Sequence, residues 1–461
     1  MKKILLFLSV CMAAGAMTLS AEEEENLNNV YIYDHVVFYD GYRMYDNPDS
    51  LVDDGILRHS CSLYSRKLTE EQLNTLGKTL NLNVFVTACC DNYDRIGNIN
   101  IAFVPKGAET YSVNDVSRIE IARFITPFMD MNKEPSTVPY KYNMDYMSLI
   151  LRDRELREKY DLWLEYELFG VPYAANEQIA GCAGRSDVFK GTLDFETDEP
   201  AEMTEGNVLV PIVIKKPEYI GSNLNNYNEE GTDTIGKTTK TYIFDVPKDV
   251  NDAQIVLITS NHGANNNGEE YKRRWHYIYY DDELVLTYKP GRESCEPFRV
   301  YNTQANGIYG WVSKSDEEWQ SFSNWCPGDV IDNRIIHLGA VKAGEHKIRI
   351  SVPNARFVGK YGDIPVSMYF HGVTEGAIDA GVSFPVAPSP LFRVTVDGGY
   401  VKMSGEASVE RVEVYTVLGE RIHIQKNANP IPLSEIKEGI CLFNIELENG
   451  IIETHKVMIR K

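Results

Sequence analysis

The chain has 461 residues, with 46 Lys and Arg against 67 Asp and Glu, which gives a net charge of −21. Its hydrophobic content of 43% is sufficient for folded cores and excludes global disorder. The acidic surplus argues against nucleic-acid binding and against adhesion to anionic lipid. At about 150 residues per domain, this length predicts about three domains.

The first residues have the pattern of a secretory signal peptide. Lys2 and Lys3 precede an apolar stretch that ends near Leu19, small residues follow, and a run of four glutamates begins at Glu22. We therefore expect residues 1–21 to be removed on export. No later apolar run approaches the roughly 18 residues that a membrane-spanning helix needs, so no membrane span is expected.

Most of the remaining chain is predicted to form short strands. Apolar, β-branched and aromatic segments alternate with Gly, Asn, Asp and Pro at a spacing of roughly 8–12 residues, which is typical of β-sandwiches and barrels. Helical signal is sparse: a capping box at residues 69–72 predicts one short helix, and residues 145–160 are ambiguous. The clearest strands are expected at residues 30–33, 84–86, 98–104, 208–214, 240–244, 255–259, 276–280 and 346–352.

Two changes in composition suggest domain boundaries. Residues 197–202 form an acidic break that contains proline, and residues 384–390 form a stiff Pro-rich segment. The expected units are an N-terminal domain at residues 22–202, a second domain at 203–380, a linker at 381–390 and a tail at 391–461.

Seven cysteines remain after the signal peptide, and an odd number leaves at least one thiol free or paired outside the chain. Export makes disulfides plausible. Cys89 and Cys90 are adjacent, so the residues allow a bridge between them or a bridge from one of them to Cys61 or Cys182. The nine histidines are scattered singly, without the spacing of a zinc or copper site, and we expect neither a metal nor another cofactor.

The tail has strands of period 2 and turns at Gly419 and Gly450, the pattern of a small antiparallel Ig-like sandwich. Its phrases VEVYTVLGE (412–420), LSEIKEGI (433–440) and KVMIRK (456–461) resemble the C-terminal sorting domain of the type IX secretion system of Bacteroidetes. Cys441 stands where that family more often has Tyr. The resemblance implies a partnership with the type IX secretion machinery, passage through the periplasm and outer membrane to a secreted or surface-attached form, and removal of the tail.

Three segments place carboxylates beside aromatic residues. This combination suits carbohydrate chemistry, because aromatic faces stack on sugar rings and carboxylates supply acid/base groups or accept hydroxyl protons. In the second segment Glu165 and Glu167 alternate and share one face of a strand. Each segment alone is more simply a solvated acidic turn or strand face, and only a fold can bring the three together. The segments are CDNYDR (90–95), WLEYELF (163–169) and NNNGEEYKRRWH (265–276).

The chain resembles the peptide-N-glycosidase F family, amidases that release N-linked glycans from glycoproteins. The resemblance covers about residues 26–380 and implies an all-β fold of two adjacent eight-stranded antiparallel jelly rolls with the glycan site in the cleft between them. The implied partners are N-glycosylated proteins or glycopeptides, and we expect a monomer. The motifs that carry the resemblance are CDNYDR at 90–95, EIARFITPF at 120–128, the strand from Glu270 to His276, and NWCPGD at 324–329.

Individual roles follow from this resemblance. It implies that Asp94 is the principal catalytic carboxylate, that Glu270 rather than Glu269 is a second one, and that Glu167 rather than Glu165 supports them. It also implies a disulfide between Cys295 and Cys326. The implied substrate-binding residues are Arg95, Tyr93, Phe169, Tyr271 and Trp325.

The chain departs from the family in several places, and two of them concern loops. Gly268 and Lys272 replace the cysteines that staple the family's glutamate loop, so packing of Tyr271 or another contact must hold it, and residues 172–194 have the composition of an inserted loop. Three other functions compete with the amidase. They are a non-catalytic N-glycan-binding surface protein on the same scaffold, a copper-dependent monooxygenase, which needs clustered His and Met ligands, and a glycoside hydrolase that cuts within the chitobiose core.

Overall fold

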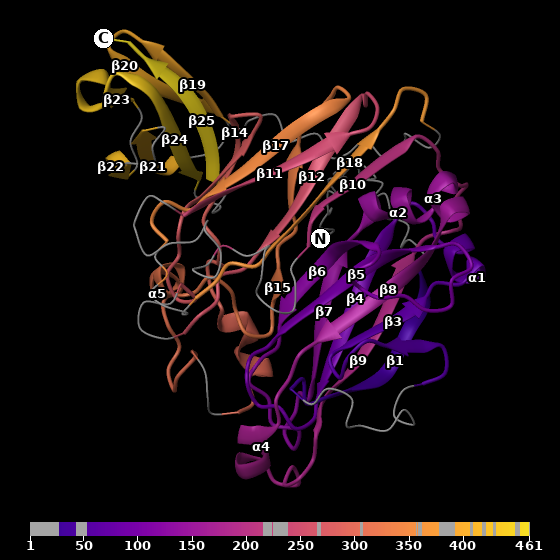
Figure 1. Cartoon of the computed structure of the whole chain (residues 1–461). Helices are drawn as coiled ribbons and strands as arrows, with labels where there is room; N and C mark the ends of the chain where they lie inside the picture. Colours follow the sequence, from indigo (N-terminus) through magenta and orange to yellow (C-terminus); the bar gives the residue numbers. More distant parts are fainter. Residues whose placement is uncertain are drawn as a thin grey trace, which may run out of the picture.

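The computed structural model of the chain shows three β-sandwiches in succession (Figure 1). The residues that it describes are 27–42, 53–214, 224, 238–264, 269–304, 308–355, 357, 362–377, 392–405, 409–416, 421–426, 430–447 and 452–460. The expected signal peptide (1–21), the expected linker (381–390) and the expected turns at Gly419 and Gly450 lie outside these residues.

The first sandwich joins an antiparallel sheet of order β1-β9-β4-β7 to a second one of order β15-β6-β5-β8-β3-β2. Its own strands are β1 (Asn28–Tyr39), β2 (Ile56–Arg58), β3 (Leu63–Lys67), β4 (Leu80–Ala88), β5 (Ile96–Pro105), β6 (Ser117–Ile125), β7 (Thr137–Asn143), β8 (Tyr160–Leu168) and β9 (Asp187–Thr197). Its helices are α1 (Glu70–Asn74), α2 (Asp145–Leu151), α3 (Arg154–Lys159) and α4 (Tyr173–Gln178).

Strand β5 shows why the sequence folds in this way. Ile99, Ile101 and Phe103 point into the core between the two sheets. The alternate residues Asn98 and Asn100 face the other side, because successive side chains of a strand point to opposite faces. The outer face of this sheet is therefore polar, and it is the face that carries Glu165 and Glu167 of β8.

The second sandwich has the sheets β10-β18-β12-β16 and β11-β17-β13-β14. Its strands are β10 (Asn207–Val213), β11 (Thr239–Val246), β12 (Asp252–Thr259), β13 (His276–Tyr280), β14 (Glu283–Tyr288), β16 (Arg334–His337), β17 (Gly344–Ser351) and β18 (Val366–Val373). A long connection after β14 carries the 3-10 helix η2 (Glu296–Tyr301) and α5 (Asp316–Phe322). It ends in β15 (Val330–Ile331), which pairs with β6 and so extends a sheet of the first sandwich.

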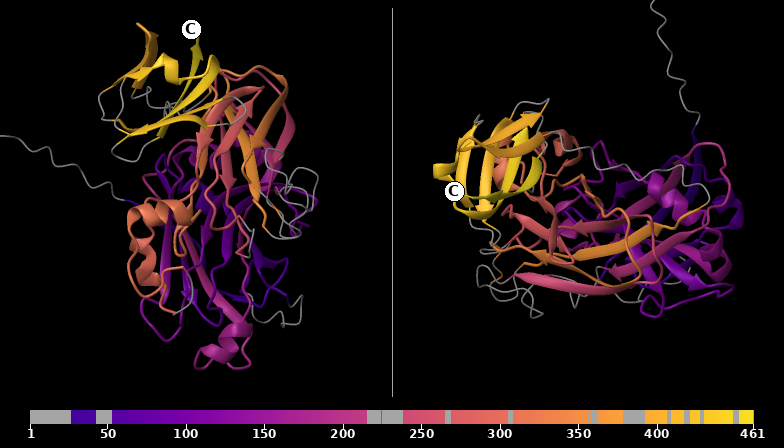
Figure 2. Two further views of the ribbon diagram at one scale, coloured as in Figure 1. Left: turned by 90° about the vertical axis from the view of Figure 1, so that its left-hand side faces the viewer. Right: turned by 90° about the horizontal axis from the view of Figure 1, so that it is seen from above.

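The tail forms a smaller sandwich with sheets of order β19-β20-β23 and β22-β21-β24-β25. Figure 2 shows it against one end of the second sandwich, where Trp275 and Tyr277 pack on Tyr415 and Leu442. Its elements are β19 (Phe392–Asp397), β20 (Tyr400–Gly405), β21 (Val409–Thr416), β22 (Arg421–Lys426), β23 (Ile431–Pro432), η3 (Leu433–Glu435), β24 (Gly439–Leu447) and β25 (Ile452–Ile459).

The structure confirms the all-β prediction of two antiparallel sandwiches and a small C-terminal one. The eight strands expected from composition overlap β1, β4, β5, β10, β11, β12, β13 and β17. The segment at 276–280 matches β13 at both ends, whereas β1 and β4 extend well beyond the expected 30–33 and 84–86. The capping box opens α1, with Thr69 accepting from the Gln72 backbone and Gln72 bonding back, and the ambiguous residues 145–160 form α2 and α3. Among the described residues, none of the helices has the length and apolar character required to cross a membrane.

A buried ion pair joins the two large sandwiches. Arg123 and Glu120, both on β6, are fully buried and bonded to each other through two contacts of 2.7 and 2.8 Å. The Arg123 guanidinium also donates to Ser260 Oγ at 2.9 Å and to the Pro365 carbonyl at 3.0 Å, both in the second sandwich. A charge buried in this way is costly to leave unpaired, so the interface that fixes the two sandwiches side by side is specific.

Candidate active site

The loop between β4 and β5 holds the first predicted carboxylate. Asp91 is fully buried in it and accepts bonds from Arg95 Nε at 2.6 Å, Val171 N at 2.7 Å and Tyr93 N at 2.9 Å. Burial raises the pKa of Asp91, and the Arg95 guanidinium opposes that rise. Asp91 is therefore an anchor with its acceptors occupied, and it fixes the backbone on which Asp94 follows.

A disulfide ties the same loop to the segment after α4. Cys90 bonds to Cys182, with their Cα atoms 5.5 Å apart, which selects one of the pairings that the sequence left open. The neighbouring Cys89 keeps a buried thiol, and burial raises its pKa to about 12. The disulfide thus attaches the segment after α4 covalently to the loop of Asp94. The expectation of one inserted loop at residues 172–194 is wrong, because Tyr173–Gln178 form α4 and the residues from Asp187 onward belong to β9, which pairs with β1 and β4.

The second predicted carboxylate lies before β13, where two adjacent glutamates have different surroundings. Glu269 is fully buried and receives two bonds from Arg274, at 2.8 and 3.2 Å. Glu270 is partly buried, and its carboxylate accepts from Gly263 N at 2.9 Å and from the Tyr271 hydroxyl. The choice of Glu270 over Glu269 therefore agrees with the geometry, because Arg274 already neutralises Glu269.

Side-chain contacts hold this glutamate loop where the resemblance leads one to expect a disulfide. The Tyr271 ring stacks on Phe322 of α5, with centroids 5.3 Å apart and planes at 12°. Gly268 lies outside the described residues. The Asn324 side-chain amide donates to the backbone carbonyls of Glu269 at 2.8 Å, Lys272 at 3.3 Å and Glu270.

Asp94 and Glu270 come from different sandwiches, yet the charge of Glu270 acts on Asp94. Burial raises the pKa of Asp94 to about 7, and the next largest cause is the negative charge of Glu270, while Arg95 acts in the opposite direction. The pKa of Glu270 is also raised by burial, and the bonds from Tyr271 and Gly263 partly offset this. A carboxyl whose pKa lies near neutral pH can both take up and give back a proton, which is the property that an acid/base catalyst needs.

Glu167 occupies a different position, on the polar face of β8. It is buried and lies opposite Asn98 of β5 in the strand register. The neighbouring Glu165 is fully buried and bonded to Arg118, to Asn100 at 2.9 Å and to the Tyr111 hydroxyl at 2.8 Å. The charge of Glu167 also acts on Arg118, where it helps to raise the pKa that burial would lower.

The five predicted substrate-binding residues have unequal exposure. Tyr93 is exposed, lies 5.9 Å from the Phe128 ring and has the Arg95 guanidinium 5.5 Å from its centroid. Phe169 and Tyr271 are half-buried. Trp325 is only 4% exposed, and its Nε1 donates to the Asn261 carbonyl at 2.8 Å.

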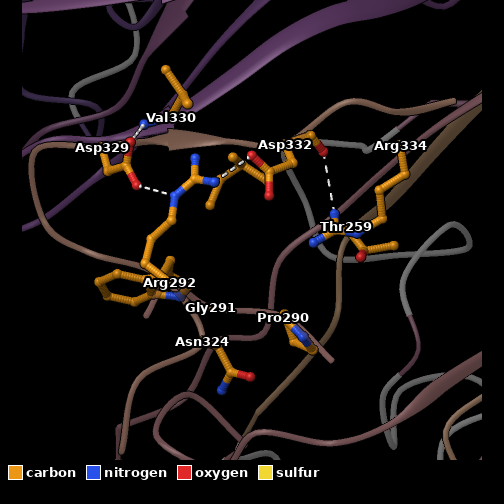
Figure 3. A pocket seen from close by; sticks show the side chains of 11 residues that line it. Thr259, Pro290, Gly291, Arg292, Asn324, Asp329, Val330, Asp332 and Arg334 are labelled. Carbon is orange, nitrogen blue, oxygen red and sulfur yellow. Dashed lines mark hydrogen bonds and ion pairs between the residues drawn. The ribbon is translucent and has the colours of Figure 1, made fainter. Parts of the chain in front are cut away.

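A small cavity lies beside Trp325, as Figure 3 shows, but none of the predicted carboxylates lines it. Arg292 crosses it and bonds to Asp329 at 2.7 Å and to Asp332 at 2.8 Å. Arg334 donates to the Asp332 carbonyl at 3.2 Å. The charges in this cavity are neutralised by one another, so we regard it as a structural element of the interface.

The predicted disulfide between Cys295 and Cys326 is present and closes the long connection that carries η2, α5 and Asn324. Within the described ranges, no cluster of three or more His, Cys, Asp or Glu side chains could hold a metal ion.

Sequence reasoning missed the groups that hold the acids in place. Arg274 and Asn324 fix the Glu270 loop, and Asp91 fixes the Asp94 loop. Two of the sequence motifs contain some of the residues that hold the loops and the interface. Asn324 opens the NWCPGD motif, and EIARFITPF contains both Arg123 of the interface and Thr126, whose hydroxyl accepts from the Arg95 backbone at 2.8 Å.

Two models of known protein domains match the two large sandwiches of the chain. The model of the peptide-N-glycosidase F N-terminal domain matches residues 29–183, and the model of its C-terminal domain matches residues 226–371. Together the two matches cover more than half of the chain. The chain belongs to the peptide-N-glycosidase F family. A comparison with curated protein sequences found no match.

Solved structures show the same fold at low sequence identity. A structure of PNGF-II in space group P21 is similar over 75% of this chain, with 18% identity and a TM-score of 0.54, and this chain spans 65% of its length. PNGase F from Flavobacterium meningosepticum, a glycosylasparaginase, is similar over 76% of this chain and 96% of its own, with 16% identity and a TM-score of 0.48. The PNGF-II likeness supports the paired jelly-roll fold, and the activity has to be argued from the site.

Proposed function

We propose that the protein is a peptide-N4-(N-acetyl-β-glucosaminyl)asparagine amidase. It hydrolyses the side-chain amide that links a glycosylated Asn to the first N-acetylglucosamine, so that Asp remains on the protein and the glycan leaves as a glycosylamine. The observation that carries this proposal is that Asp94 and Glu270, one from each sandwich of a peptide-N-glycosidase F family chain, both have a raised pKa and that the charge of Glu270 acts on Asp94.

The chemistry requires a base that is also an acid. An amide is a poor electrophile, and its nitrogen leaves only when it is protonated. Ionised Asp94, with a pKa of about 7, takes a proton from water as the water oxygen bonds to the amide carbon. Protonated Asp94 then returns that proton to the nitrogen as the carbon–nitrogen bond breaks, so the products are a carboxylic acid and an amine.

The neighbouring groups adjust and orient this centre. Arg95 lowers the pKa of Asp94 and keeps the ionised form available at neutral pH. Glu270, held by Gly263 and Tyr271, hydrogen-bonds to a hydroxyl of the sugar. Glu167 supports the reaction through an intervening water. The faces of Tyr93, Phe169, Tyr271 and Trp325 and the Arg95 guanidinium contact the substrate.

Mass analysis of a glycopeptide tests the activity and separates it from its competitors. The amidase converts the glycosylated Asn to Asp and releases the intact glycan. A GlcNAc left on the peptide would mean a glycoside hydrolase, and binding without release would mean a glycan-binding protein. Oxidative cleavage that depends on copper would mean a monooxygenase.

Asp94→Asn tests the assignment of the base. It is expected to lower kcat by about 10²–10⁴-fold, the usual contribution of a positioned acid or base. Asp34→Asn is the matched control, because Asp34 is an exposed aspartate on β1, far from the Glu270 loop in the chain. Near-normal glycan release by Asp94→Asn would refute the assignment.

We further propose that residues 391–461 direct export through the type IX system to a secreted or surface-attached form. The sorting-domain phrases of the tail support this, as does the tail's separate core around Val414, Phe443 and Ile459. The disulfides Cys90–Cys182 and Cys295–Cys326 also fit an oxidising compartment. Deletion of the tail is expected to leave the protein in the periplasm of a host with this system. Unchanged appearance outside the outer membrane would refute the proposal.

A further inference from the structure

Strand β13 of the second sandwich has two faces of different chemistry. Ile278 points into the core of the sandwich. Three aromatic residues lie on the opposite side, because successive side chains of a strand alternate between its faces. They are Trp275, directly before β13, and Tyr277 and Tyr279 within it. We call these three residues the aromatic face of β13. In the same sheet, the outward side chains of β11 are mostly exposed to solvent.

The tail covers this aromatic face, as the contact between the two units in Figure 2 shows. The Tyr415 ring of β21 lies 6.1 Å from the Trp275 ring and 6.4 Å from the Tyr277 ring, edge-on to both. Leu442 of β24 joins the same cluster. Trp275 is therefore only 9% exposed and Tyr277 only 3% exposed.

The tail contributes side chains that its own fold does not use. Val414 and Phe443 pair across β21 and β24 and point into the core of the tail. Tyr415 and Leu442 are the next pair in the register, so they lie on the outer face of the same sheet. Large apolar side chains gathered on an outer face indicate a contact surface.

A buried carboxylate lies at the same contact. The Tyr415 hydroxyl donates to Glu413, which is buried and has Arg421 Nη1 3.5 Å from its carboxylate. Burial raises the pKa of Tyr277, and the charges of Tyr279 and of Glu413 add to this rise. Glu413 of the tail therefore acts on a residue of the second sandwich. A buried charge requires specific partners, so this contact has one defined geometry.

The contact lies at the end of the loop that carries Glu270. Trp275 directly follows Arg274, whose guanidinium holds Glu269. Further along the loop, the Tyr271 ring stacks on α5. The loop is thus supported at Glu269, at Tyr271 and at Trp275, and the tail supplies the third of these supports.

We propose that the tail has a second function besides export: docked on the aromatic face of β13, it acts as an intramolecular support that orders the Glu270 loop. The tail is covalently attached, so the contact forms without the affinity that two free molecules would need. A chain that has lost its tail keeps its acids but holds this loop less firmly. The effect on turnover rests on the amidase function, whereas the effect on order does not.

The test uses the full chain with the double substitution Tyr415→Ser and Leu442→Ser, which removes the contact and leaves the core of the tail intact. Tyr400→Ser is the matched control, because Tyr400 is 43% exposed and lies on β20, in the other sheet of the tail. Tyr415→Phe is the conservative variant, since it keeps the ring. Hydrogen–deuterium exchange is measured by mass spectrometry at residues 269–275, 276–280 and 439–447, together with steady-state kinetics on a glycopeptide.

The double substitution is expected to speed exchange at residues 269–275 and 276–280 about tenfold, because the supporting contact is lost. Exchange at 439–447 stays as it was. KM rises about threefold, since Glu270 is proposed to contact the sugar. The pH dependence of kcat is unchanged, because Asp94 lies in the other loop. Tyr400→Ser and Tyr415→Phe behave as the parent chain.

Unchanged exchange at residues 269–275 would overturn the proposal, and faster exchange confined to 276–280 would limit the tail to supporting the sheet. Unfolding of the tail in the double variant would also remove the contact, so the measurement at 269–275 decides in either case. If the parent chain released no glycan, the amidase function would fail, while the exchange measurement would still decide whether the tail orders the loop.

Discussion

The loops that carry Asp94 and Glu270 belong to different sandwiches, yet they are built on the same plan. In each loop one acid is buried against an arginine: Asp91 against Arg95, and Glu269 against Arg274. The nearby acid, Asp94 or Glu270, has a raised pKa, and the charge of Glu270 contributes to the rise at Asp94. An arginine-bound carboxylate thus serves as the anchor in both loops, and the carboxylate beside it is left for chemistry.

The two loops differ in how they are fastened. A disulfide to Cys182 fixes the Asp94 loop, whereas the Asn324 amide and the stacking of Tyr271 on Phe322 fix the Glu270 loop. The Asn324 amide, which bonds to several carbonyls, thus holds the Glu270 loop where the resemblance leads one to expect a disulfide.

The largest expected effect belongs to the reacting acid of the second loop. Glu270→Gln should lower kcat/KM by about 10²–10⁴-fold, because it removes the negative charge that helps to raise the pKa of Asp94 and the carboxylate proposed to bind the sugar. Its free energy of unfolding should change little, since the Gly263 N–H donates to one carboxylate oxygen and glutamine keeps one oxygen. Steady-state kinetics and thermal unfolding measure the two quantities. A stability loss without an activity loss would reverse the roles that we assign to the two glutamates.

Glu269→Gln should have the opposite profile. It leaves Arg274 without a charged partner at a buried site, which should lower the free energy of unfolding by about 3 kcal/mol. Denaturant titration measures this value. Activity per folded molecule should fall far less than in Glu270→Gln. Equal activity losses in the two variants would remove the distinction between anchor and reacting acid.

Asp94 should make stability depend on pH. Its pKa in the folded state, about 7, is higher than its value in the unfolded chain, so the folded state binds the proton more tightly. Stability should therefore fall as pH rises from about 4 to 7, and the cost should be complete above pH 7. Asp94→Asn removes that cost and should raise the free energy of unfolding at pH 8 by roughly 4 kcal/mol.

Melting curves of both proteins between pH 4 and pH 8 test this sign. Their stabilities should converge at the acid end and separate at the alkaline end. An Asp94→Asn protein that is less stable than the parent at pH 8 would mean that the carboxylate is an ordinary ion-pair member.

The smallest expected effect concerns the fastening of the Glu270 loop. Asn324→Ala removes the amide that bonds to the carbonyls of Glu269 and Lys272 and should cost about 1 kcal/mol of stability. KM should rise more than kcat falls, because Glu270 contacts the sugar. The matched change, Cys90→Ala with Cys182→Ala, removes the disulfide that fixes the Asp94 loop. It should instead alter the pH dependence of kcat, because Asp94 is the proposed acid/base group. If both changes produced the same kinetic profile, the two loops would not act separately.

Much of the fold could be predicted from the sequence because strand periodicity is local. The alternation of Asn98, Ile99, Asn100 and Ile101 predicts both β5 and its two faces. The pairing of Asp94 with Glu270 is not local, and only the family resemblance indicated it. The Cys90–Cys182 bridge and the pairing of Arg274 with Glu269 could not be predicted, because several partners were equally possible in the sequence and tertiary packing selects among them.

The Arg123 contacts also affect how the molecule moves. A hinge opening between the two large sandwiches would draw the guanidinium away from Ser260 and the Pro365 carbonyl and would leave a buried cation poorly solvated. The pair β15–β6, which continues one sheet with a strand from the other unit, resists the same movement. The two sandwiches should therefore unfold in one cooperative transition. Under the proposed function, a glycoprotein has to fit a site of fixed shape, so the shape of bulky folded substrates governs their access.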